Sequence, residues 1–236
     1  MRFSLKTALV LFVIAAFAVS WFQAWRKLAV TRQLSTVTIE EFTDRKKFES
    51  RLGELVEIGF DDVDTSKRDS VAIASDRYRQ QGLAIDAAGG LYASRTFSFP
   101  QQYPPVSGRN SVAVGPPGKN PGGTETDFLF VTGSEPGLVS AVGVTFVDAD
   151  FPSSGASGLT IFGWDDRQLA ATKPIQGVNA SHEFRGFIAV DADGELIPAI
   201  GRARATSGSG WPGVDAGDGV TMDDLMFTTP QPSPIR

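Results

Sequence analysis

The feature that most constrains the fold is a series of short strand-like runs separated by turns rich in glycine and proline. About ten such runs follow residue 36, whereas one short segment, residues 43–53, has a helical pattern. This organisation predicts an all-β protein, a jelly-roll-type β-sandwich with one short helix near its start. The runs are residues 37–42, 55–63, 82–86, 91–99, 110–115, 126–133, 138–150, 158–164, 184–190, 196–206 and 220–227.

The helical segment has recognisable ends. Thr43 or Asp44 can cap its first turn, and Gly53 is placed to stop it. Phe48 and Leu52 lie four residues apart and therefore share one face. We expect a single short helix here.

Two connections have the composition of hairpin turns. The sequence WDDRQ at 164–168 can turn between two runs, and DADGE contains Asp193-Gly194, the strongest short hairpin signal. Trp164 ends an apolar run, so we expect its side chain in the core.

The first 27 residues form a separate unit. Basic residues stand at positions 2 and 6, an apolar run extends from about Ala8 to Phe22, and Arg26 and Lys27 follow. A basic start before an apolar run is typical of a secretory signal or a membrane anchor. We predict a tether over residues 28–35 after this unit.

Two interpretations of the N-terminal unit remain open. Residues 16–18, Ala-Phe-Ala, match a signal-peptide cleavage pattern, whereas residues 7–24 have the length of a short spanning helix. Trp21, Phe22 and Trp25 suit a membrane interface, and such bulky residues disfavour cleavage, so we favour an anchor. Either interpretation places the protein in the cell envelope outside the cytoplasm, anchored in the inner membrane or secreted. The β-sandwich should then span 36–229, with a disordered tail at 230–236.

The charge of the chain argues against a nucleic-acid partner. The whole chain has a net charge of −5, and residues 1–27 contribute four basic and no acidic residues, so the remainder carries −9. An acidic exported domain suits neutral or cationic ligands and repels nucleic acid and anionic lipid. The absence of cysteine excludes disulfides, cysteine-ligated zinc and a thiol nucleophile.

Two adjacent aspartates, Asp223 and Asp224, stand in the last strand-like run, DGVTMDDLMF. Because strand side chains alternate between faces, one of the two should be buried. Val220, Met222 and Met226 share the face of Asp224, so we expect Asp224 inside.

This run should pair with residues 55–62 near the start of the domain and close the sandwich. That pairing would bring Asp61 and Asp62 close to Asp223 and Asp224, and crowded carboxylates need a partner.

Three partners for these aspartates remain open. Arg202 and Arg204, on one face of their strand, could form ion pairs, with solvent receiving the outward carboxylates. Backbone N–H groups are the second partner. The third is a structural Ca²⁺ held by Asp61, Asp62, Asp223 and Asp224, the one cofactor that the sequence suggests.

Aromatic residues in loops are the candidate ligand contacts. Trp211 lies in SGSGWPG and Tyr103 in FPQQYPP, where little local core is available. Each could stack on a sugar or contact a partner, or fold as a lid over the end of the sandwich.

Catalytic motifs are lacking. His182 is the single histidine, and Ser181 beside it does not lie in a nucleophile elbow. We find no zinc-protease, phosphate-loop or dinucleotide motif. We therefore expect no enzyme.

Several short motifs follow one another in a characteristic order: DRKKFESRLG, IGFDDV, DRYRQQGLAI, VSAVGVTFVDAD, GLTIFGWDDRQL, FRGFIAV, IGRARATSG and DGVTMDDLMF. Over about residues 38–228 they resemble an exported bacterial β-sandwich family that is common among PEP-CTERM-sorted envelope proteins. The resemblance implies a galactose-binding or lectin-like jelly roll. The Pro-Glu-Pro sorting tail of that family is missing from the end of this sequence, TTPQPSPIR, so we expect membrane attachment through the N-terminal helix.

These observations predict a non-catalytic, exported or membrane-anchored binding or interaction module. A glycan is the favoured ligand, by analogy of fold. An envelope protein is the alternative partner, which would make the chain a structural module without a small ligand. A hydrolase with an unrecognised site is the remaining alternative.

Overall fold

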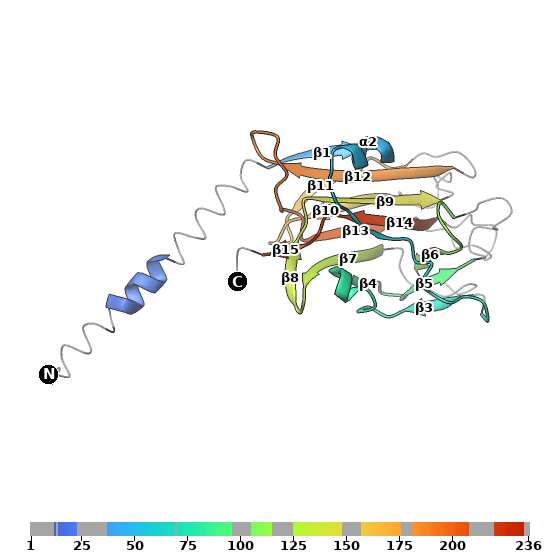
Figure 1. Ribbon diagram of the computed structural model, residues 1–236, viewed down its shortest axis with the longest axis horizontal. Coiled ribbons are helices and arrows are strands. Elements are labelled where there is room, and N and C mark those ends of the chain that lie inside the picture. The colour runs from blue at the N-terminus through green and yellow to red at the C-terminus, as the bar shows by residue number, and fades with distance from the viewer. Residues whose placement is uncertain are drawn as a thin grey trace.

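The computed structural model describes residues 12, 14–22, 37–68, 70–95, 105–114, 125–147, 157–175, 181–207 and 220–233. This part of the chain is mostly β and forms a sandwich of two antiparallel sheets, as the sequence predicted (Figure 1). Every predicted run contains a strand.

The first sheet has eight strands and contains both the first and the last long strand of the domain. β2 pairs with β14 beside the main path of the sheet. Along that path the order is β1 (Thr38–Phe42), β12 (His182–Val190), β9 (Ala141–Val147), β14 (Thr221–Phe227), β6 (Ser111–Val114), β5 (Leu91–Ser94) and β3 (Val71–Ile73), with β2 (Val56–Ile58) at its side.

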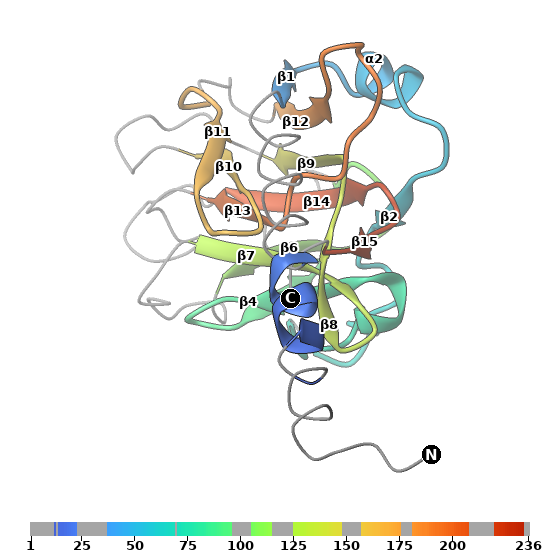
Figure 2. The ribbon, with the colours of Figure 1, turned by 90° about the vertical axis from the view of Figure 1, so that its left-hand side faces the viewer.

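The second sheet has seven strands and packs across the first (Figure 2). β4 (Leu83–Asp86) pairs with β7 beside the main path. The order along the path is β11 (Gln168–Ala171), β10 (Gly158–Phe162), β13 (Arg202–Thr206), β7 (Glu125–Thr132), β8 (Glu135–Leu138) and β15 (Gln231–Pro232).

The core lies between the sheets and is rich in phenylalanine. Phe128 and Phe130 of β7 face Phe146, Phe187 and Phe227 of the first sheet, and all five are almost fully buried. The rings of Phe130 and Phe227 lie 5.3 Å apart. Burial of these large side chains contributes strongly to the packing of the two layers.

Helix α2 (Arg45–Ser50) covers the outer face of the first sheet. Its N-cap is Asp44, which accepts a hydrogen bond from the backbone N–H of Lys47, so one of the two predicted caps is confirmed. Phe48 is fully buried beside Phe184, with ring centres 5.2 Å apart. A Cβ atom at Gly186 would lie 2.8 Å from the Phe48 ring, so the glycine makes room for the helix.

Both predicted hairpin turns are confirmed. Residues 163–167 turn between β10 and β11, with Asp166 at a φ of 58°, and Gly194 turns at a φ of 83°. Trp164, which we expected in the core, is 40% exposed, because the chain leaves the sheet at Gly163 and carries it onto the turn. That prediction is wrong.

The end of the domain also differs from the prediction. We expected a disordered tail from residue 230, but Gln231 and Pro232 pair with Leu138 and Gly137 of β8. Pro230 packs against Gly82 and Gly137, which lack a Cβ and let the chain approach. The domain therefore extends beyond residue 229.

Residues 14–22 near the N-terminus are helical, and Phe17, Trp21 and Phe22 on them are exposed. Among the described residues, no helix has the length and hydropathy that a membrane span requires. The predicted tether, residues 28–35, lies outside the described residues.

Candidate functional site

A β-bulge in β14 buries both aspartates. Asp223 pairs with Thr145 of β9, and the register then shifts before Met226. Asp224 has a φ of 49°, and both aspartates have 0% exposure. Met222 consequently faces the core between the sheets, whereas Met226 faces the outer cluster with Phe48. Our prediction that one aspartate is buried and the other faces outward is wrong, because the bulge interrupts the alternation of side chains.

The bulge lies where β14 changes its partner along one edge. β6 pairs with Met222, and β2 pairs with residues 225–227. The predicted pairing with residues near the start of the domain is thus confirmed. β14 lies inside the sheet, with β9 on one side, and β2 covers the part of its other side that β6 leaves unpaired.

Ser107 fills the gap between the two partner strands. Its backbone N–H donates to Asp223 Oδ2 at 3.0 Å, and its hydroxyl donates to Asp224 Oδ1 at 2.6 Å. The N–H of Asp224 donates to Asp223 Oδ1 at 2.8 Å. Backbone donors, the second alternative from the sequence, therefore hold Asp223.

An arginine, the first alternative, holds Asp224, but it is neither of the two that we named. Arg45 of α2 donates to Asp224 Oδ2 at 2.5 Å and also binds Glu49 and Glu57, each at 2.7 Å. Although burial opposes its charge, these carboxylates raise the pKa of Arg45. One guanidinium group thus forms ion pairs with three carboxylates.

Arg202 and Arg204 lie on the second sheet, where both bind Asp127. Arg202 also lies 3.7 Å above the ring of Phe162. The alternative that these two arginines pair with the aspartates of β14 is therefore excluded, because β13 and β14 belong to different sheets. Although burial opposes ionisation, these arginines lower the pKa of Asp127.

Asp223 differs from its neighbour because it contacts no cation among the described residues. Burial raises the pKa of Asp223 to about 7, and the charge of Asp224 adds to this rise, while the N–H of Ser107 opposes it. The pair therefore contains a carboxyl that changes charge near neutral pH.

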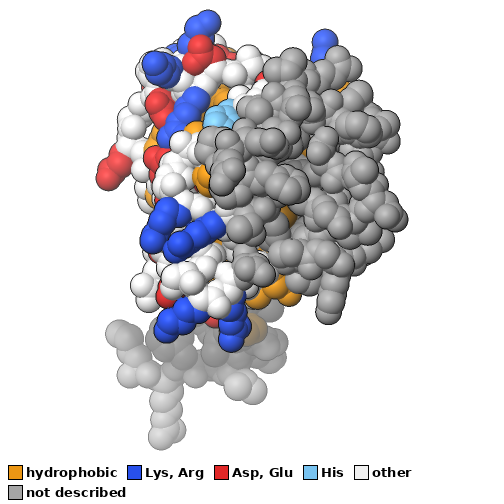
Figure 3. All heavy atoms as spheres, turned by 90° about the vertical axis from the view of Figure 1, so that its right-hand side faces the viewer, with side chains coloured by type: hydrophobic (Ala, Val, Ile, Leu, Met, Phe, Trp, Pro, Cys, Tyr) orange, Lys and Arg blue, Asp and Glu red, His pale blue; other side chains and the backbone are white. Residues whose placement is uncertain are grey.

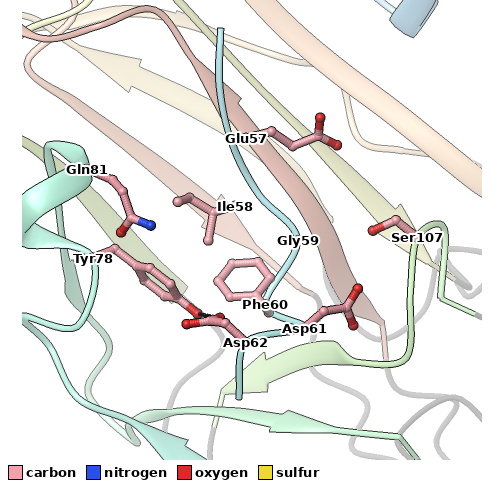
Figure 4. A pocket seen from close by; sticks show the side chains of 9 residues that line it. All are labelled: Glu57, Ile58, Gly59, Phe60, Asp61, Asp62, Tyr78, Gln81 and Ser107. Carbon is pink, nitrogen blue, oxygen red and sulfur yellow. Dashed lines mark hydrogen bonds between the residues drawn. The ribbon is translucent and has the colours of Figure 1, made fainter. Parts of the chain in front are cut away.

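A hollow of about 350 Å³ lies beside β2, and Ser107, which binds the buried pair, is among the residues that line it (Figure 4). Phe60 and Tyr78 form its apolar part, with ring centres 5.8 Å apart in an edge-to-face arrangement. Figure 4 shows the polar side chains on two sides of Ile58 and Phe60. They are Gln81, Tyr78 and Asp62 on one side and Glu57, Asp61 and Ser107 on the other.

Asp61 joins two segments of the chain that we call the two walls of the hollow, residues 57–62 and the segment 107–110 that begins at Ser107. Its Oδ1 accepts the backbone N–H groups of Arg109 and Asn110, at 2.6 and 3.0 Å. The side-chain NH₂ group of Asn110 donates two hydrogen bonds, to the carbonyl oxygens of Phe60 and Val63. The wall is therefore preorganised, which lowers the entropy cost of binding a ligand.

Asp62 points to the other side of the hollow. It accepts hydrogen bonds from the Tyr78 hydroxyl at 2.7 Å and from Arg77 Nε at 3.0 Å. Burial and this hydrogen bond raise the pKa of the Tyr78 hydroxyl, so Tyr78 stays neutral and donates.

The four aspartates that we considered as Ca²⁺ ligands do not form one set. Asp62 binds Arg77, Asp61 binds backbone N–H groups, and Arg45 occupies the pair in β14. Among the residues that the structure describes, no group of three or more acidic or histidine side chains could hold a metal ion. The arrangement does not fit calcium.

The remaining candidates have mixed outcomes. Trp211 and Tyr103 lie outside the described residues. His182 is exposed at the start of β12. Arg45, Ser107 and Gln81 were missed, since arginine on a surface helix and serine in a Gly/Pro-rich loop carry no pattern of their own. On the described part of the face in Figure 3, acidic and basic side chains are interspersed.

Comparisons with known proteins add little to this geometry. No family model and no curated protein matches the chain. The Arthrobacter globiformis T6 isomalto-dextranase complexed with panose is 12% identical over 62% of this chain and 23% of its own length, with a TM-score of 0.29. The enzymatically active domain of bacteriophage CBA120 tailspike protein 4 is 9% identical over 83% of this chain and 20% of its own, with a TM-score of 0.28.

A third structure is the K1 cleaved adhesin domain of Lys-gingipain from Porphyromonas gingivalis W83. It is 11% identical over 75% of this chain and 99% of its own, with a TM-score of 0.27. This chain thus spans less than a quarter of the first two proteins. At these TM-scores none of the three supports an argument about fold or function.

Proposed function

We propose that this chain is a non-catalytic, jelly-roll-type module that binds carbohydrate hydroxyl groups in the hollow beside β2. The observation that carries the proposal is a preorganised hollow with an apolar floor and hydrogen-bonding groups on two sides. Such a combination of an apolar floor with a few fixed polar groups suits a small polar ligand.

Acceptor atoms in the hollow are available to a ligand. Among the described residues, Asp61 Oδ2, Glu57 Oε2 and the side-chain amide of Gln81 make no hydrogen bond. A sugar presents several hydroxyl donors around one ring and can satisfy acceptors that lie apart. The hollow therefore matches a polyhydroxylated ligand better than an apolar one.

The carboxyl that titrates near neutral pH does not argue for catalysis in the hollow. Asp223, with a pKa of about 7, is fully buried and is not one of the described residues that line the hollow. A general acid or base must reach the reacting proton within hydrogen-bonding distance. Asp223 cannot approach a ligand in the hollow without a rearrangement of the wall.

We further propose an extracytoplasmic location, with the N-terminal segment as the means of export or anchoring. The basic flanks of that segment and the exposed Phe17, Trp21 and Phe22 support this proposal. N-terminal sequencing of the mature protein tests it, since a start near residue 19 means cleavage and an intact N-terminus means an anchor.

Binding of the full chain to a glycan array tests the function directly. Gln81→Ala removes an amide of the hollow and should weaken binding to any glycan that the wild type retains. Gln168→Ala, an exposed residue on β11 of the other sheet, is the matched control and should not. If no glycan is retained, or if both variants behave alike, the hollow is not a carbohydrate site and the structural-module alternative gains support.

A further inference from the structure

The hollow has an uneven charge. Three carboxylates, Glu57, Asp61 and Asp62, belong to the described residues that line it, and no basic side chain does. A ligand in the hollow therefore meets a negative potential.

The arginines that contact these carboxylates do not cancel the excess. Arg45 is divided among Glu57, Glu49 and Asp224. Arg77 binds the carboxylate of Asp62 and also donates to its backbone carbonyl. Two guanidinium groups thus form ion pairs with four carboxylates, so they cannot neutralise all of the negative charge. The carboxylate of Asp61 contacts neither guanidinium group.

We propose that the hollow selects sugars by charge, binding amino sugars with a free ammonium group most tightly, neutral sugars less tightly, and uronic acids least. This inference names the ligand class for the proposed function and rests on it. An ammonium group brings three donors and a positive charge to carboxylates with free acceptor atoms. A uronate brings a carboxylate to carboxylates and is repelled.

The shape of the hollow favours a sugar ring over the side chain of a basic peptide. Its acceptors lie on two sides of Ile58 and Phe60, with Gln81 on one side and Glu57 and Asp61 on the other (Figure 4). A ring with hydroxyl and ammonium groups around its edge can reach both sides. A lysine side chain carries all its donors at one tip and can satisfy only one side.

The test compares oligosaccharides that share a backbone and differ in charge. The probes are oligomers of β-1,4-linked glucosamine, glucose and glucuronate, together with the corresponding galactosamine, galactose and galacturonate series, each titrated into the full chain by calorimetry. At low salt we expect the ammonium-bearing oligomer to bind about tenfold more tightly than the neutral one, and the uronate about tenfold more weakly. High salt should reduce both differences, because the charges that set them are partly exposed.

Paired variants assign the effect to the hollow. Glu57→Gln removes one negative charge from the lining. It should reduce the ratio between the affinities for the ammonium-bearing and the uronate oligomers. Glu135→Gln, an exposed residue on β8, is the matched control and should leave it unchanged. If the Glu57 variant does not fold, the salt dependence of the wild type remains as the test of the charge effect.

The outcomes separate this inference from the function on which it rests. If a uronate binds as tightly as its neutral partner, selection by charge is overturned while carbohydrate binding stands. If no oligomer of either series binds, the proposed function fails and the inference with it. A lysine-rich peptide that competes as well as the glucosamine oligomer would overturn the choice of a sugar as the ligand.

Discussion

Arg45 and Asp224 stand 179 positions apart in the sequence and form an ion pair that ties the first helix of the domain to its last long strand. The Asp224 side chain is 1% exposed and that of Arg45 29%. A carboxylate buried to this degree depends on its partner, because removal of the arginine leaves an uncompensated charge. The pair thus links α2 to the bulge beside the hollow.

We expect Arg45→Met to destabilise the domain by about 1–3 kcal/mol, because it leaves the buried Asp224 carboxylate without a cation. A double-mutant cycle with Asp224→Asn, measured by urea unfolding, should give a coupling energy of similar size. Arg51→Met is the matched control at the end of the same helix. It breaks an exposed pair with Glu40 and should cost less than about 0.5 kcal/mol.

Equal losses from the two arginine substitutions would contradict this assignment. So would a coupling energy near zero between Arg45 and Asp224. Either result would mean that the packing of α2 depends on Phe48 and its neighbours alone.

The stability of the domain should fall as the pH rises from about 4 to about 7. The pKa of Asp223 is raised from its usual value near 3.8 to about 7, so in this window the folded chain holds a proton that the unfolded chain has released. One such proton lowers the free energy of unfolding by up to about 1.4 kcal/mol per pH unit. Asp127 has the opposite dependence, but below this window, because its pKa is lowered.

Asp223→Asn isolates this effect. The amide cannot ionise, and its single oxygen can accept from only one of the two N–H groups, Ser107 or Asp224, that the carboxyl now accepts on separate oxygens. We therefore compare the slopes of the two pH profiles and not their absolute heights. Urea unfolding at pH 5, 6, 7 and 8 should show a steep loss of stability in the wild type and a flatter profile in the variant. Parallel profiles would show that Asp223 does not titrate in this range.

The two-sheet architecture could be predicted because its signal is local and repeated. Alternating runs and Gly/Pro-rich turns recur along the chain, and every run proved to contain a strand. The short strands β3, β11 and β15 were missed, since two to four residues at a sheet edge carry too little pattern.

The site could be predicted only in part, for a physical reason. The expectation that Asp223 and Asp224 face opposite ways assumed a regular strand, and a bulge of one residue cancels it. The pairing of β14 with β2 was predicted correctly, but the partners of the aspartates come from α2 and from Ser107, whose positions depend on tertiary packing. Sequence spacing contains no information on such contacts.

Chelation should leave the melting temperature unchanged. Arg45 and the donors of Ser107 and Asp224 already engage the carboxylates in the bulge, so a divalent cation is not needed to relieve their repulsion. We expect the same thermal unfolding curve in EDTA and in added Ca²⁺. A melting temperature that falls in EDTA and recovers with Ca²⁺ would restore the calcium hypothesis.

Gly108 provides a test of the wall of the hollow that does not depend on charge. Its φ is +52°, and a Cβ atom added there would lie 1.3 Å from Asp61 Oδ2. Gly133 has a similar φ of +64°, but an added Cβ would meet nothing within 4 Å. Alanine at either position lowers the free energy of unfolding by about 1 kcal/mol, because its backbone is strained in the left-handed region. The two substitutions therefore differ in the contact with Asp61.

We therefore expect Gly108→Ala to lower the melting temperature more than Gly133→Ala. The added methyl group must displace Asp61, whose Oδ1 then loses the N–H groups of Arg109 and Asn110 that join the two walls. Asp61→Ala should cost less in the Gly108→Ala background than in the wild type, because the clash and the hydrogen bonds are then removed together. Glycan binding should fall in Gly108→Ala and persist in Gly133→Ala. Equal melting temperatures for the two glycine variants would mean that Asp61 does not pack against Gly108, and that the wall of the hollow is held in another way.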